Sequence, residues 1–195
     1  MPGGRPRTFD EDEALDRAMR VFWARGYERT SLPELLDAMG IARQSLYHAF
    51  GDKRALFLRC LDRYAAEAAR PTLERLRAPG RAIDALLDVV RDWGRGCTQK
   101  PQLGCMIASA PGQFSGDDAE VLAALAKHRD AAEAAFRDAL ARARDEGDLP
   151  DDADPETLAR ALLAMQFGIG VLRRLPRSKK LVDAAVRQAE RLLGR

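Results

Sequence analysis

The chain has 195 residues, of which 46% are hydrophobic, enough for a buried core in one large domain or in a small and a larger domain. Its 32 lysine and arginine residues are nearly balanced by 30 acidic residues, so the net charge of +2 neither favours nor excludes nucleic-acid binding, and any affinity for DNA must come from local placement. No segment approaches the roughly 20 apolar residues of a membrane span, and residues 1–13 lack the apolar stretch of a secretory signal, so we expect a cytoplasmic protein without membrane contact.

Residues that favour helices dominate the chain, and no stretch shows the alternation of a half-buried strand. The sequence therefore predicts an all-α protein with about nine helices. The first helix should begin after Asp10, an N-cap followed three residues later by Glu13 in a capping-box arrangement, and it should end at Gly26.

Residues 31–50 are typical of two short helices separated by Gly40, which can take the left-handed conformation that reverses the chain. Ser31 and Glu34 form a capping box for the first of these helices. The second, over about residues 43–50, should carry polar side chains on its outer surface: Arg43, Gln44, Ser45, Tyr47 and His48. Such side chains can contact base edges or phosphates, so the segment is typical of a helix-turn-helix DNA reader.

Asp52 should cap a long fourth helix that extends to about Leu76 and could bend at Pro71, and residues 78–80 form the clearest break in the chain. Beyond the break, the pattern predicts a fifth helix around residues 83–93, a short sixth within 101–111, a seventh over 117–146, an eighth from about 155 and a ninth over 179–193. We therefore expect an N-terminal arm and DNA-binding domain over residues 1–60 and a C-terminal domain for ligand binding and dimerisation over 61–195.

The last two predicted helices are broadly apolar, and the eighth has apolar residues on nearly every face. Two adjacent helices of this kind are what each subunit would contribute to a four-helix dimer interface. We therefore predict a homodimer whose interface is formed by Leu158, Leu162, Met165, Ile169, Leu172, Val182, Val186 and Leu193.

The order of motifs over residues 5–65 resembles the N-terminal domain of the TetR/AcrR family of transcriptional repressors. The resemblance rests on FWxxGY at the end of the first helix, TSL at the start of the second, MGIARQSLYHAF across the turn and reading helix, and FGDK at the start of the fourth. It implies a homodimeric repressor that leaves a palindromic operator in double-stranded DNA when a small hydrophobic or amphipathic molecule enters the C-terminal domain. An activator remains the alternative within this class.

The family's DNA contacts, transferred position by position, make Arg43 and Gln44, with Ser45, the readers of base edges. The same transfer implies phosphate contacts from Tyr47, His48, Lys53, Thr30 and Ser31, the last two at the positive end of the second helix. Tyr47 could instead brace the reading helix, and His48 could be a solvated surface residue. Arg5 and Arg7 precede the first helix in an arm that could enter the minor groove or remain a flexible basic tail.

Six residues lie on helices that would surround an effector cavity, although residues of these types are also typical of a helical core: Trp93, Cys105, Met106, Phe114, Phe136 and Phe167. Cys105 and nearby Cys97 also permit a redox- or electrophile-sensing regulator. No metal-ligand spacing, phosphate-binding loop or catalytic motif is present in the sequence, so we expect no metal, no cofactor and no enzymatic activity. A helical interaction module without DNA binding is the remaining alternative.

Overall fold

The computed structural model describes residues 9–95, 103–113 and 118–194, and within these residues the regular structure is entirely helical. The predicted all-α fold is therefore confirmed, with nine α-helices in the part described: α1 Glu11–Arg25, α2 Leu32–Met39, α3 Arg43–Phe50, α4 Lys53–Arg77, α5 Ala82–Arg95, α6 Met106–Ser109, α7 Ala119–Asp145, α8 Pro155–Leu172 and α9 Lys179–Leu192. None of the described helices combines the length and apolar character needed to cross a bilayer.

Local signals determine where most of these helices begin and end. Asp10 caps α1 by accepting from the backbone N–H groups of Asp12 and Glu13 at 2.8 and 3.1 Å. The Glu13 side chain pairs with Arg17 instead of completing the predicted box. The box of α2 is complete, because Ser31 and Glu34 each bond the other's backbone N–H. Each such cap contributes about 1 kcal/mol, so these residues strongly favour the observed helix starts.

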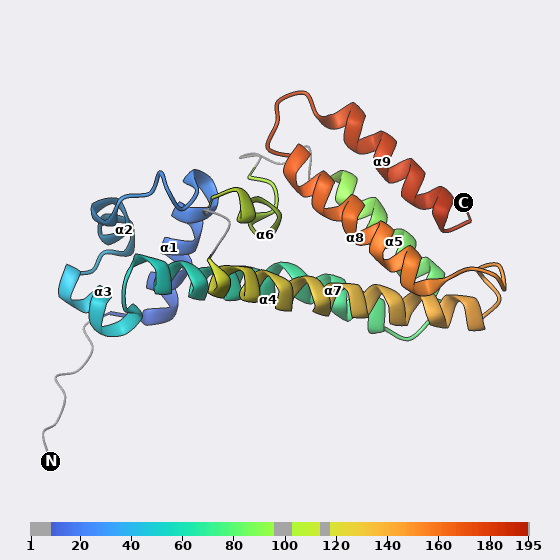
Figure 1. Ribbon diagram of the computed structural model, residues 1–195, viewed down its shortest axis with the longest axis horizontal. Coiled ribbons are helices and arrows are strands. Elements are labelled where there is room, and N and C mark those ends of the chain that lie inside the picture. Colours follow the sequence, from blue (N-terminus) through green and yellow to red (C-terminus); the bar gives the residue numbers. More distant parts are fainter. Residues whose placement is uncertain (1–8, 96–102, 114–117, 195) are drawn as a thin grey trace, which may run out of the picture.

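Helices α4 and α7 pack along each other and form the long axis of the molecule (Figure 1). The small helices α1, α2 and α3 gather at one end of this pair, around the start of α4, whereas α5, α8 and α9 pack at the other end. The short α6 lies between the two groups. Helix α4 therefore runs without interruption from one group to the other.

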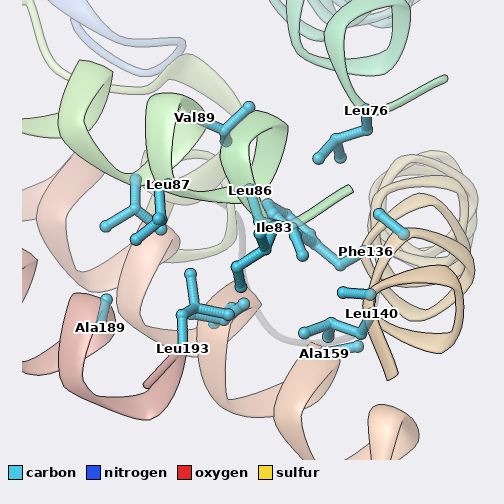
Figure 2. Close-up of a cluster of buried hydrophobic side chains, with 14 of the residues drawn as sticks. Leu76, Ile83, Leu86, Leu87, Val89, Phe136, Leu140, Ala159, Ala189 and Leu193 are labelled. Carbon is cyan, nitrogen blue, oxygen red and sulfur yellow. The ribbon is translucent and has the colours of Figure 1, made fainter. Parts of the chain in front are cut away.

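Two separate clusters of buried side chains correspond to these two ends. The N-terminal core joins α1–α3 to the first half of α4, and it also takes in Met106 and Ile107 from α6 and Val121 and Leu125 from α7. The C-terminal core joins α5, α7, α8 and α9 to Leu76 at the end of α4 (Figure 2). The predicted division at residue 60 therefore falls inside a continuous helix that contributes to both cores.

Four of the eight predicted dimer residues are buried in the subunit's own core, and the other four are only partly buried. Leu162, Ile169, Val182 and Leu193 have 0–3% of their surface exposed, so they cannot face a second subunit. Leu158, Met165, Leu172 and Val186 are partly buried against the same C-terminal core. Apolar spacing along a helix identifies a face that is buried but not the surface that buries it. The exposed apolar side chains at this end are instead Val171, Leu175, Leu181 and Leu192.

Candidate DNA-binding site

Helix α3 presents four polar side chains to solvent and anchors its opposite face in the N-terminal core. Leu46 and Phe50 are 0% and 3% exposed, whereas Arg43, Gln44, Tyr47 and His48 are exposed and Ser45 is half-buried. Among the residues described, none of the four exposed side chains forms a hydrogen bond or an ion pair, so their donors and acceptors are available to an external partner. Ala42 gives the helix no side-chain cap, so the first N–H groups of α3 also lack a side-chain acceptor.

Arg59, a residue that the sequence analysis did not identify, contacts the C-terminal end of α3 from the first half of α4. The Nη1 atom of Arg59 donates to the carbonyl of Ala49 at 2.8 Å, and its guanidinium lies 4.7 Å from the centre of the Phe50 ring. A guanidinium at this position satisfies one of the carbonyl groups that a helix end leaves without an internal partner. Since Arg59 is on α4, nothing in the local sequence of α3 indicates this contact.

The start of α4 lies beside α3 and is tied to the start of α7. Lys53 is the first residue of α4, and its Nζ atom lies 4.3 Å from the centre of the Tyr27 ring. The next residue, Arg54, donates from Nε and Nη2 to Asp118 at 2.9 and 2.5 Å and also pairs with Glu120. The hydrogen bonds from Arg54, together with that from the backbone N–H of Val121, lower the pKa of Asp118 to about 2. Asp118 therefore stays ionised and keeps the two helix starts together.

The side chain of Thr30, predicted to contact a phosphate, lies inside the subunit and not at its surface. The side chain is 1% exposed, and its hydroxyl donates to the carbonyl of Gly26 at 2.6 Å. Ser31 is at the surface, but its hydroxyl and its backbone N–H are both engaged by the Glu34 carboxylate. Arg5 and Arg7 lie outside the described residues. Among the described residues, the candidate site therefore consists of the exposed face of α3 and the start of α4.

The five predicted effector residues that the structure describes are divided between the two cores. Trp93 and Phe136 belong to the C-terminal core, where their rings meet edge to face with centroids 6.2 Å apart. Cys105, Met106 and Phe167 belong to or border the N-terminal core. Phe114 lies outside the described residues.

A surface groove of about 890 Å³ runs between α4 and α7. Its floor contains Leu73 and Ala132, which also border a recess of about 40 Å³ closed by Phe136 and Gln166. Charged side chains, including Arg70, Arg77 and Lys127, line the groove outside this apolar floor. Next to Phe136, the buried Nε1–H of Trp93 has no hydrogen-bond partner among the residues that the structure describes.

Cys105 caps the short helix α6 and is half-buried, with its Sγ atom accepting from the backbone N–H of Ala108 at 3.4 Å. Burial, together with the neighbouring Cys105, raises the pKa of Tyr64. Cys97 lies outside the described residues. Among those that are described, no three His, Cys, Asp or Glu residues come close enough together to hold a metal ion.

Helix α3 is polar on its exposed face and is anchored by its apolar face in a small three-helix unit, to which a larger helical domain is joined. This arrangement defines a helix-turn-helix DNA-binding protein with a regulatory domain. Residues 14–60 match the family described as bacterial regulatory proteins, tetR family, and residues 79–189 match the tetracyclin repressor-like C-terminal domain. The chain therefore belongs to the TetR family of bacterial transcriptional regulators.

Relatives that span nearly the whole chain share about a third of its residues. It is 35% identical to the uncharacterised regulator YezE of Bacillus subtilis, covering 94% of this chain and 97% of that protein. It is 31% identical to the transcriptional repressor ComR of Escherichia coli, covering 88% and 82%. Among solved structures, a cysteine mutant of the TetR-family regulator CifR, complexed with 26-bp operator DNA, is 36% identical with a TM-score of 0.80, covering 94% of this chain and 98% of that one.

Proposed function

We propose that this chain is a transcriptional repressor that binds its operator through α3 and leaves it when a small amphipathic molecule binds the C-terminal half. The observation that carries the proposal is the set of four exposed, unpartnered polar side chains on a helix that is anchored by Leu46, Phe50 and Arg59. The repressor assignment is supported by ComR and BdcR of Escherichia coli, both described as repressors, and by the operator complex of CifR. Such a regulator acts on the bacterial chromosome, hence in the cytoplasm, and needs no catalytic group.

Within this proposal, Arg43 and Gln44 read base edges, with Ser45 beside them. A bidentate arginine–guanine or glutamine–adenine pair supplies about 1–3 kcal/mol of discrimination. Contacts from Tyr47, His48 and Lys53 to phosphates, with Ser31 at the edge of the site, would orient the reader without adding sequence information. Arg5 and Arg7 would add contacts in the minor groove.

The repressor would act as a homodimer, because two reading helices separated by about 34–36 Å match successive major grooves of a palindromic operator. The exposed apolar side chains on and between α8 and α9 favour this end as the interface: Val171, Leu175, Leu181 and Leu192 are 45%, 51%, 60% and 36% exposed. These residues replace the buried set that sequence spacing favoured.

The groove between α4 and α7 is the described cavity best placed for the effector. Its volume of about 890 Å³ lies within the range of about 300–1,000 Å³ that is usual for small-molecule sites. An apolar floor with charged edges suits an amphipathic molecule, and a hydrogen-bond acceptor that reaches past Phe136 could pair with the Nε1–H of Trp93. A ligand that separates α4 from α7 would shift the population towards arrangements in which the start of α4 no longer supports α3.

The experiment that tests DNA recognition is selection of bound duplexes from a random pool at physiological salt, followed by the same selection with Arg43→Ala. We expect a palindromic motif for the wild type and relaxed preference at one position of each half-site for the variant. The matched control is Arg137→Ala, an exposed arginine on α7 that lies away from α3. If the wild type selects no motif, or if Arg43→Ala leaves the motif unchanged, the proposed reading face is wrong. Absent duplex binding would favour the interaction module.

A second candidate, thiol-based sensing, is favoured by one observation. Cys105 is a half-buried thiol that caps α6, the short helix between the two cores, and the CifR relative was crystallised as a cysteine mutant. If sensing operates, alkylation should release the wild type from the operator but not Cys105→Ser. Equal affinity before and after alkylation of the wild type would eliminate this function.

A further inference from the structure

The corner between α1 and α2 is held by residues that lie 81–151 positions further along the chain. The backbone N–H of Tyr27 donates to Gln113 Oε1 at 2.6 Å, and the indole Nε1–H of Trp23 donates to the carbonyl of Gly104 at 3.1 Å. From the end of α8, Nη2 of Arg174 donates to the carbonyls of Trp23 and Ala24 at 3.3 and 3.5 Å. The hydrogen bonds from Arg174 therefore connect the regulatory end of the molecule to the DNA-reading end at this corner.

A hollow of about 340 Å³ opens beside this corner, and both ends of the molecule line it. We call it the seam hollow. Its polar side chains are Arg25, Glu28 and Arg29 from the corner, Ser109 and Gln113 from the α6 segment between the two groups, and Arg174 from just beyond α8 at the regulatory end. Its volume lies at the lower end of the range of about 300–1,000 Å³ that is usual for small-molecule sites. Ligand sites often form at such junctions between domains.

The charge of the seam hollow is strongly unbalanced, because three arginines face a single glutamate, Glu28. Each guanidinium carries five N–H donors. The described contacts use one nitrogen of each: Nη1 of Arg25 pairs with Glu34, Nε of Arg29 bonds the carbonyl of Arg25, and Nη2 of Arg174 bonds the end of α1. Most of the guanidinium donors are therefore left for another acceptor.

The two uncharged polar side chains of the hollow are already engaged. Gln113 accepts from Tyr27 and donates to the carbonyl of Ser109, and the Ser109 hydroxyl donates to the carbonyl of Cys105. Beside the single carboxylate of Glu28, the groups that remain available are the guanidinium N–H donors of the three arginines, which match the geometry of phosphate and carboxylate oxygens. A cleft lined mainly by one sign of charge also concentrates ions of the opposite sign.

We propose that the seam hollow binds a small multivalent oxyanion, such as a phosphorylated metabolite, through Arg29 from the DNA-reading end and Arg174 from the regulatory end. This site is separate from the α4–α7 groove and would make a second input to the regulator. Because the ligand contacts both ends at once, its binding favours the arrangement in which Arg174 is hydrogen-bonded to the end of α1. Arrangements that separate the two ends lose one half of the contacts and bind the ligand less tightly.

The test is calorimetric titration of the full chain, free of DNA, with metal-free sodium pyrophosphate at constant ionic strength. We expect saturable binding by the wild type, and an affinity about tenfold or more lower in Arg29→Gln, since charge-assisted hydrogen bonds are lost. Arg174→Gln should weaken binding similarly, and its melting curve reports whether the corner still folds. Arg137→Gln, which removes an exposed charge on α7, should bind like the wild type.

Three results would overturn the proposal: no saturable heat for the wild type, unchanged affinity in Arg29→Gln, or an equal loss in Arg137→Gln. The same variants distinguish a free anion from the operator backbone as the source of the phosphate. If Arg29 served only the backbone, Arg29→Gln would lower the salt slope of operator binding by about one while pyrophosphate produced no heat. That combination also counts against the site.

Discussion

Replacing Thr30 with valine tests whether this residue is structural or contacts DNA. The two side chains have nearly the same shape, so Thr30→Val removes the hydroxyl and leaves the carbonyl of Gly26, on a residue that is itself buried, without its bond at 2.6 Å. Leaving a buried acceptor unpaired costs about 1–3 kcal/mol. For a chain of this size, each kcal/mol lowers Tm by roughly 2–4 °C.

The assay is urea unfolding followed by circular dichroism at one protein concentration, because the stability of a dimer depends on concentration. We expect a lower midpoint with an unchanged slope, and operator affinity within about twofold of wild type, since twofold corresponds to only about 0.4 kcal/mol. Thr30→Ser is the matched control, because it keeps the hydroxyl and loses only a buried methyl group, about 1 kcal/mol. If Thr30→Val unfolds like the wild type but loses affinity for the operator, the hydroxyl contacts DNA and the burial argument is refuted.

Three further predictions test other parts of the structure. Asp118→Asn keeps a capping oxygen but removes the charge paired with Arg54. Folding lowers the pKa of Asp118 to about 2, from roughly 3.9 when unfolded, so the wild type should lose this stabilisation as the pH falls from about 4 to 2. Urea titrations over this pH range should show a smaller loss of stability in the variant. Gly104 has φ +64° and faces a backbone carbonyl of α8, so Gly104→Ala should lower the free energy of unfolding by more than about 1 kcal/mol; an unchanged midpoint would contradict this. Leu181→Glu places a charge on the proposed dimer face and should give folded monomers in analytical ultracentrifugation. Leu162→Glu, at a position 0% exposed, should instead unfold the subunit. If the Leu181→Glu variant remains a dimer, the proposed face is excluded.

The helices and the face of the reading helix could be predicted from sequence because they depend on neighbours three or four residues apart. Asp10, Ser31 and Asp52 cap the helices that their positions predicted, and Gly40 takes the left-handed conformation, with φ +68°. Four of the five polar positions of α3 are exposed, Ser45 is half-buried, and Leu46 and Phe50 are buried, as the spacing indicates. These features follow from hydrogen bonds and side-chain directions within a single turn of helix.

The tertiary structure alone decided which apolar face meets the subunit's own core, and it buried four of the eight predicted dimer residues there. It also buried Thr30, divided the described effector residues between two cores, brought Arg59 of α4 to the end of α3, and brought Arg174 to the end of α1, about 150 residues away in sequence. A pattern of apolar residues shows that a surface must be covered but does not identify what covers it. That choice depends on how segments far apart along the chain pack, and no local spacing contains this information.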